Sequence, residues 1–450
     1  MQILCKGELL LALLLCGGCR ATLGSQPTVA HEASPAPVAQ SLEPGAGLPH
    51  TGDSVDTLHG VEVPDPFRWL EQADSPETRA WAQAQDARAR QRLEALPGRA
   101  GLLRRLEALS YIEWAGAPVQ RGGRLFYERR PAGQEKAILY WQRDEADEAR
   151  VLLDPAKLSA DGHVALKGWW PSHDGHWLVY TLSENNADEA TLHLLEVQTG
   201  EQRSIDRIPG ARYARPAWLP DGSGFYYTRW PLDPAIPVDQ RPGKAAIYLH
   251  LLGAPYTRDA LVFAATDDPT LFISPSLSRD GRYLFVHRYH GWTRNDVLVR
   301  DLHRDEEFQP LVEGLDAHFF VRAWRGRFYI LTDLDAPRWR LMTSRPRQPI
   351  PAQWTELVPE REGAVLEDFH IAGGRLLLHH LRNARSELSL ARLDGTPLRD
   401  LPLPEIGSVK RISAEPELAR FYYTFSSFTA PTRVLQNDGT GARSAPYFQL

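Results

Sequence analysis

The sequence predicts an all-β fold, a seven-bladed β-propeller preceded by a short helical N-terminal segment. Three observations predict it: a turn followed by an aromatic-rich strand recurs seven times, further strand-like segments follow each copy, and no long helical pattern occurs after residue 110. Four-stranded antiparallel units recurring about every 40 to 50 residues are typical of propellers. A long solenoid is the competing geometry, but four-stranded units with hairpin turns favour closure into a ring.

The repeated hairpin is clearest at 278–286 (SRDGRYLFV) and at 172–180 (SHDGHWLVY). Asp-Gly and Gly-Gly supply the positive φ angles of tight hairpin turns, and the aromatic and β-branched run that follows each turn is typical of a strand. Consecutive turn residues are 45 to 59 positions apart in the sequence. They are Gly123, Gly175, Gly222, Gly281, Gly326, Gly374 and Ala419. A second strand pair follows each hairpin, as at 246–251 and 260–263, so seven repeats predict seven blades.

The first nineteen residues predict an export signal. They contain Lys6, an apolar run to Leu15 and all three cysteines of the chain; this run is too short to span a membrane as a helix. The end of this segment, Gly17-Gly18-Cys19, resembles the lipobox of bacterial lipoproteins, which implies acylation of Cys19, membrane attachment through that lipid and a location in the cell envelope or periplasm. An ordinary cleaved signal is the alternative. Residues 20–58, rich in Ala, Pro, Ser and Gly, are expected to form a flexible tether.

Residues 59–110 are expected to form the helical segment. Ser75 can cap a helix whose first turn contains Pro76, and this helix should run to about Leu96. A second helix is predicted over 99–109, with leucines at the spacing of one helical face. These apolar stripes need a partner surface, which is either the ring or a second chain.

The propeller is expected over 111–450. Its first blade begins after the helices and its last blade reaches the end of the sequence, so the order of elements requires no strand exchanged between the terminal blades. Without such a latch, we expect the contact between the first and last blades to be the weakest in the ring, with the fastest amide exchange.

Composition and motifs exclude several functions. The formal net charge of −6 gives no electrostatic reason to expect nucleic acid. No His-Glu-x-x-His, phosphate loop or dinucleotide-binding glycine motif occurs, and no cysteine follows residue 19, so we predict no metal site and no cofactor. The string closest to a nucleophile elbow, Gly222-Ser223-Gly224, falls in a predicted hairpin turn. We therefore assign no catalytic residue.

The segment 65–71 (DPFRWLE), followed by 75–78 and Trp81, is similar to the N-terminal part of the prolyl oligopeptidase family of serine peptidases. The similarity continues through 221–227 and 425–432 and covers about residues 60–450. This resemblance implies a propeller that caps an α/β-hydrolase domain and admits short peptides to a Ser-Asp-His triad that cleaves after proline.

In that family the hydrolase domain follows the propeller, and its triad has no matching positions here. The resemblance therefore implies a substrate-gating propeller that is inactive alone, as a truncated or split peptidase whose partners are short peptides or a separately encoded hydrolase domain. It also implies that Tyr226 offers an aromatic ring to the substrate cavity, for which packing between blades is the alternative. A stand-alone cell-envelope propeller that binds a peptide, protein or glycan is the second hypothesis. Catalysis by propeller residues is a third, for which no cluster of acids, bases or metal ligands stands out.

Overall fold

The computed structural model describes residues 51–145, 147–159, 161–304, 307–347, 350–440 and 443–448. The chain divides into two compact units between Ser110 and Tyr111. The predicted export signal and Cys19 lie outside the described residues. Within the described ranges, neither helix is both long enough and apolar enough to cross a membrane.

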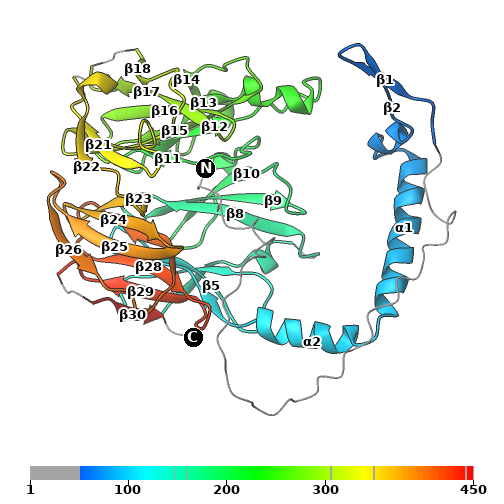
Figure 1. Cartoon of the computed structure of the whole chain (residues 1–450), viewed down its shortest axis with the longest axis horizontal. Helices are drawn as coiled ribbons and strands as arrows, with labels where there is room; N and C mark the ends of the chain where they lie inside the picture. Colours follow the sequence, from blue (N-terminus) through cyan, green and yellow to red (C-terminus); the bar gives the residue numbers. More distant parts are fainter. Residues whose placement is uncertain are drawn as a thin grey trace, which may run out of the picture. The chain divides into compact units, whose positions relative to one another are not determined.

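The N-terminal unit contains a hairpin of β1 (Val55–Leu58) and β2 (Val61–Pro64), a short 3-10 turn, and the helices α1 (Pro76–Glu94) and α2 (Arg99–Ser110) (Figure 1). Ser75 caps α1 as predicted, because its hydroxyl accepts a hydrogen bond from the Thr78 amide at 3.1 Å. The apolar stripes are also present. Their leucines are 50 to 61% exposed, namely Leu93, Leu96, Leu102, Leu106 and Leu109.

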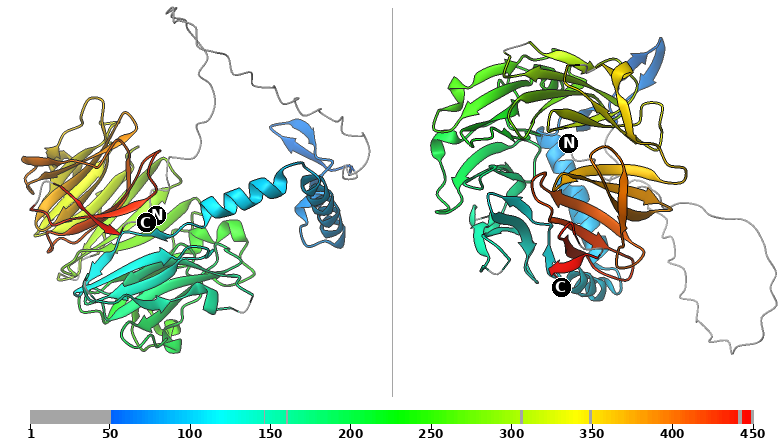
Figure 2. Two further views of the ribbon diagram at one scale, coloured as in Figure 1. Left: turned by 90° about the horizontal axis from the view of Figure 1, so that it is seen from below. Right: turned by 90° about the vertical axis from the view of Figure 1, so that its left-hand side faces the viewer.

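The second unit consists of seven antiparallel sheets, which confirms the predicted seven-bladed propeller (Figure 2). Blades 1 to 3 contain β3 (Trp114–Ala115), β4 (Val119–Arg121), β5 (Arg124–Arg130), β6 (Ile138–Gln142) and β7 (Arg150–Leu153); β8 (Val164–Pro171), β9 (Trp177–Glu184) and β10 (Thr191–Glu196); and β11 (Ala217–Trp218), β12 (Gly224–Arg229), β13 (Ala246–Leu251) and β14 (Ala260–Phe263). In blade 2 the fourth position is held only by isolated bridges, from Leu192 to Ile208 and from Leu195 to Gln202.

Blades 4 to 7 each have four strands in sequence order. They contain β15 (Leu271–Leu277), β16 (Tyr283–His290), β17 (Arg294–Asp301) and β18 (Gln309–Val312); β19 (Phe319–Trp324), β20 (Arg327–Thr332), β21 (Arg340–Ser344) and β22 (Thr355–Val358); β23 (Val365–Ala372), β24 (Arg375–Arg382), β25 (Arg385–Ala391) and β26 (Pro397–Leu401); and β27 (Ser408–Ala414), β28 (Phe421–Ser426), β29 (Arg433–Asn437) and β30 (Ala445–Phe448). The seven repeated hairpins of the sequence are the turns between the first two strands of the blades.

Seven apolar clusters hold the ring together, one between each pair of neighbouring blades. The second strand of a blade supplies both of its neighbours, since successive side chains of a strand point to opposite faces. In β12, for example, Phe225 and Tyr227 pack toward blade 2, whereas Tyr226 packs toward blade 4. This double burial explains why the repeats are aromatic-rich rather than strictly alternating.

The first and last blades meet without exchanging a strand among the described sheets, as the order of elements predicted. Their cluster has five buried residues, as many as between blades 3 and 4 and fewer than the thirteen between blades 4 and 5, but only two partly buried residues, Tyr447 and Phe448, pack against it. A polar contact supplements it, because the Glu145 carboxylate accepts hydrogen bonds from Arg420 at 2.7 Å and from Tyr422 at 3.3 Å. Whether this contact is the weakest in the ring stays a prediction.

The ring has two distinct ends. The hairpin end carries the turns between the first and second strands and between the third and fourth strands of each blade. The connector end carries the other turns and the connections between blades. Because β4 runs toward the hairpin end and β30 runs away from it, the propeller begins and finishes at the connector end.

Candidate functional site

A cavity of about 380 Å³ lies against the first strands of four consecutive blades, β4, β8, β11 and β15. First strands of adjacent blades contact one another, which places this cavity at the centre of the ring. Three tryptophans contribute to its wall, Trp169, Trp170 and Trp218. Two of their indole nitrogens are already hydrogen-bonded, Trp169 to Glu128 at 2.6 Å and Trp218 to the Trp170 carbonyl at 3.0 Å. The tryptophans therefore form a rigid apolar wall.

Two arginines line this cavity: Arg121, which pairs with Glu415, and Arg215, which lies just before β11. Arg215 is half-buried, and burial lowers its pKa, because desolvation disfavours the charged guanidinium. No carboxylate in the described part of the chain pairs with it. An arginine is nevertheless protonated at neutral pH, so the cavity contains a cation with unused hydrogen-bond donors.

A serine and a histidine also meet at the cavity wall. The Ser276 hydroxyl lies 3.0 Å from Nε2 of His287, and burial lowers the pKa of His287 to about 4, so its imidazole is neutral at neutral pH. A nucleophilic serine needs a histidine that a third group orients. Nδ1 of His287 has no such partner among the described residues. The pair therefore lacks the orienting group that serine nucleophiles require.

An ionic cluster spans the axis at the hairpin end of the cavity. Arg279, in the first turn of blade 4, contacts His173 of blade 2 and reaches Glu417 of blade 7 with its Nε at 3.2 Å. Glu415 of blade 7 pairs with Arg121 of blade 1, and its second carboxylate oxygen lies 3.8 Å from Arg279. Four blades are thus connected by charged side chains, which we call the axial cluster.

The axial cluster is largely shielded from solvent. The side chains of Arg121 and Glu415 are 22% and 11% exposed. Burial, together with the adjacent charge of Arg279, lowers the pKa of Arg121 to about 10, which still leaves this guanidinium protonated at neutral pH. Since buried charges persist only when they are paired, this cluster fixes the first turns of the blades relative to one another and obstructs the axis at this end.

Tyr226, the residue expected from the resemblance to face the substrate cavity, is only 6% exposed. It packs with Ile247, Ile273 and Leu284 between blades 3 and 4, which is the packing alternative that the sequence left open. Its role in substrate binding stays a prediction. Sequence reasoning did not find Arg215, Ser276 or the axial cluster, because their local sequences carry no motif.

No group of three or more histidine, cysteine or acidic side chains in the described ranges is arranged to hold a metal ion. Away from the axis, His250 is fully buried between two aspartates. Its ring nitrogens lie 2.8 Å from Asp259 and 3.0 Å from Asp206. Since it does not line the cavity described above, we interpret it as structural.

A ring of seven antiparallel blades, closed without strand exchange among the described sheets and with a cavity on its axis, defines the class of this protein as a seven-bladed β-propeller. The family model described as the prolyl oligopeptidase N-terminal beta-propeller domain matches residues 49–448. The chain therefore belongs to this family.

Similar proteins agree with this assignment. The prolyl endopeptidase of Elizabethkingia meningoseptica is 26% identical over 395 residues, which are 87% of this chain and 55% of that protein. A solved structure from a study of two prolyl endopeptidases and their inter-domain dynamics is 42% identical with a TM-score of 0.86, covering 89% of this chain and 59% of that one. Prolyl oligopeptidase B of Galerina marginata, bound to a 35-mer hydrolysis and macrocyclization substrate, shares the fold with a TM-score of 0.80 at 23% identity. The chain thus spans slightly more than half the length of these relatives.

Proposed function

We propose that this propeller admits and holds short peptides in its axial cavity and presents them to a serine peptidase domain of the prolyl oligopeptidase type. The observation that carries the proposal is Arg215, a cation without a carboxylate partner among the described residues, in a cavity walled by three tryptophans. A guanidinium there can donate to a peptide carbonyl or to a terminal carboxylate, while the indole edges provide apolar contact. The family membership supports the same function.

The direction of access follows from the axial cluster. Arg279 and its partners obstruct the hairpin end, so a peptide is expected to enter the cavity from the connector end. That end also bears exposed apolar side chains in its loops, where Trp292 is 70% and Ile406 75% exposed and Phe428 is fully exposed. Trp292 belongs to blade 4, whereas Ile406 and Phe428 lie at blade 7, so these side chains offer a covering domain apolar contacts at two places on this end of the ring. We therefore place the peptidase domain at the connector end.

Binding of a proline-containing octapeptide, followed by tryptophan fluorescence, tests peptide admission. We expect the substitution Arg215→Ala to weaken binding about tenfold, the loss of one charged hydrogen bond. Arg258→Ala removes an exposed arginine at the outer edge of blade 3 and should leave affinity within about twofold. Equal affinity of all three proteins would contradict the proposal.

Docking of the peptidase domain is tested separately. A hydrolase domain of a prolyl endopeptidase relative, added in trans, should bind the wild-type propeller in analytical ultracentrifugation, and Phe428→Asp should weaken the complex. Leu251→Asp, at an exposed position of the hairpin end, is the matched control. If both variants behave like wild type, the stand-alone interaction propeller is the better hypothesis.

We also propose that the chain is exported and lipid-anchored through Cys19. This rests on the resemblance of Gly17-Gly18-Cys19 to a lipobox after an apolar run. Metabolic labelling with an alkyne fatty acid in a bacterial host should label the wild-type chain, and Cys19→Ala should abolish the label. A secreted but unlabelled wild-type chain would indicate an ordinary cleaved signal instead.

A further inference from the structure

A second cavity, of about 760 Å³, lies at the hairpin end between blades 4 and 5. The aromatic rings of Tyr283 and Phe328 contribute to it and meet edge to face with their centroids 5.1 Å apart. Both rings belong to the largest apolar cluster of the propeller. The two packed rings therefore form one wall of the cavity, and turns of the two blades form the others. We call it the interblade cleft.

Six of the thirteen residues that line the interblade cleft are arginines. They come from the turns between the first and second strands and between the third and fourth strands of both blades, or from the strand ends beside these turns. They are Arg282, Arg304, Arg325, Arg327, Arg345 and Arg347. The whole chain carries a formal net charge of −6, so this cluster runs against the overall balance. General enrichment in basic residues does not explain it.

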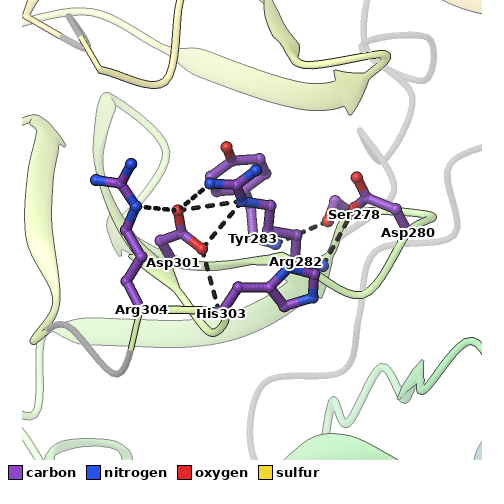
Figure 3. Close-up of polar contacts among 7 residues, drawn as sticks. All are labelled: Ser278, Asp280, Arg282, Tyr283, Asp301, His303 and Arg304. Atoms are coloured by element: carbon purple, nitrogen blue, oxygen red, sulfur yellow. Dashed lines mark hydrogen bonds and ion pairs between the residues drawn. The ribbon is translucent and has the colours of Figure 1, made fainter.

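Asp301 is the one carboxylate among these lining residues, and it is fully used (Figure 3). Its oxygens accept hydrogen bonds from Arg282, the shortest at 2.7 Å from Nη2, and from the His303 amide at 3.1 Å. Nε of Arg304 lies 3.5 Å away. The hydrogen bond from Arg282 also lowers the pKa of Asp301, so this carboxylate is ionised at neutral pH and can accept little more.

The side chains of the other four arginines form no hydrogen bond or ion pair with another residue in the described part of the chain. Arg325 lies over the ring of Trp324, 5.6 Å from its centroid. Arg327, Arg345 and Arg347 are exposed at the rim. Six guanidinium groups converge on this cavity and only one lining carboxylate, Asp301, offsets their charge, so the guanidinium groups repel one another and a bound anion relieves this repulsion.

We propose that the interblade cleft binds a small oligophosphate, either free or as a phosphate ester. Planar guanidinium groups match phosphate oxygens with paired hydrogen bonds, and arginine rather than lysine is the residue that provides this geometry. The volume is that of a small-molecule site. Several guanidiniums around one cleft suit a ligand with several neighbouring charges better than a single carboxylate. This site is distinct from the axial cavity and does not depend on the proposed peptidase role.

Isothermal titration with sodium tripolyphosphate tests the proposal on the whole chain. The double variant Arg345→Gln/Arg347→Gln removes two rim cations without touching a buried contact, and we expect it to weaken binding about tenfold or more. The matched control, Arg258→Gln/Arg392→Gln, removes two exposed arginines from the corresponding turns of blades 3 and 6. It changes the net charge equally and should leave affinity within about twofold.

Three further measurements fix the chemistry of the ligand. Affinity for tripolyphosphate should fall as salt rises from about 50 to about 300 mM, because the contacts are ionic and salt screens them. Inorganic phosphate should bind more weakly than tripolyphosphate, and adenosine triphosphate with similar affinity would identify an ester as an acceptable source. Equal weakening in both double variants, no binding of tripolyphosphate, or tighter binding of a tetraglutamate peptide would each overturn the proposal.

Discussion

At the scale of single residues, burial decides which ionisable groups have structural roles. His250 is fully buried, with one ring nitrogen at Asp259 of its own blade and the other at Asp206 of the preceding blade. Tyr227 donates to the second oxygen of Asp259 at 2.7 Å. This buried network joins blades 2 and 3 where blade 2 has only isolated bridges in place of a fourth strand.

We predict a pH-dependent contribution of His250 to stability. Burial alone lowers its pKa, but the hydrogen bonds to both aspartates outweigh burial and raise the pKa to about 9. A histidine whose pKa is higher in the folded state stabilises fully below its unfolded pKa, near 6.5, and this stabilisation is lost as pH rises through about 9. His250→Gln should therefore destabilise at pH 6 by about 3 kcal/mol or more, and less at pH 9.5.

Thermal unfolding midpoints between pH 6 and 9.5 measure this effect. The matched control is His193→Gln, since burial lowers the pKa of His193 to about 4 and its neutral ring does not titrate in this range. Because the unfolded histidine binds a proton near pH 6.5 and the folded one does not, His193→Gln should destabilise less at pH 6 than at pH 9.5, the opposite trend to His250→Gln. A difference for His250→Gln that is constant, or that follows the trend of His193→Gln, would contradict the prediction.

At the scale of elements, the tight turns determine how closely neighbouring blades approach. Gly122 and Gly123 form the first turn of blade 1, with φ of +53° and +73°. A Cβ at Gly122 would lie 1.7 Å from the Asp174 carbonyl oxygen in the first turn of blade 2, whereas a Cβ at Gly123 would meet no atom within 4 Å. Alanine at either position must adopt a left-handed backbone, but only alanine at Gly122 would also clash with the neighbouring blade. Comparing the two substitutions therefore distinguishes the cost of backbone conformation from the cost of the clash.

We predict that Gly123→Ala costs about 1 to 2 kcal/mol, which is the cost of a left-handed backbone for alanine. Gly122→Ala should cost more than this, because the hairpins of blades 1 and 2 must also separate. Urea unfolding followed by tryptophan fluorescence provides both free energies of unfolding. Equal values for the two variants would show that the contact with Asp174 relaxes without cost.

The elements were largely predictable, whereas the sites were not. Turn residues such as Gly222 and the strand runs after them are local signals, and the cap at Ser75 is equally local, so sequence was sufficient for both. Which face of β12 the Tyr226 side chain occupies depends on the pleat of the strand and on how the neighbouring blades pack against it. The axial cluster joins Arg121, Arg279 and Glu415, which come together only after the ring has closed. No spacing in the sequence predicts such a contact.

At the scale of the whole molecule, the ring is closed by side chains alone among the described sheets. We predict that amides of β5 and β28, at the contact of blades 1 and 7, exchange with deuterium faster than those of β16 and β20 in blades 4 and 5. The reason is the smaller apolar cluster, with five buried residues compared with thirteen. Mass spectrometry of peptide fragments measures the exchange.

A variant can sharpen this comparison. Glu145→Ala removes the carboxylate that Arg420 and Tyr422 contact across the closure, and should accelerate exchange in β28. Glu189→Ala, which breaks an exposed ion pair with Arg212 away from the closure, should not. Uniform protection across all seven blades in the wild-type protein would contradict the prediction.

Residues near both ends of the propeller lie next to the same strand, β5. Arg130 lies 6.0 Å from the ring centroid of Tyr111, and the adjacent Arg129 lies 5.2 Å from that of Phe448. Residues near both ends of the unit thus contact consecutive positions of β5. A short linker could join them, and a circular permutant opened at an exposed turn of another blade would keep every blade intact. Because residues near its two ends lie side by side, the ring meets the geometric requirement for insertion into a host domain at a single surface loop.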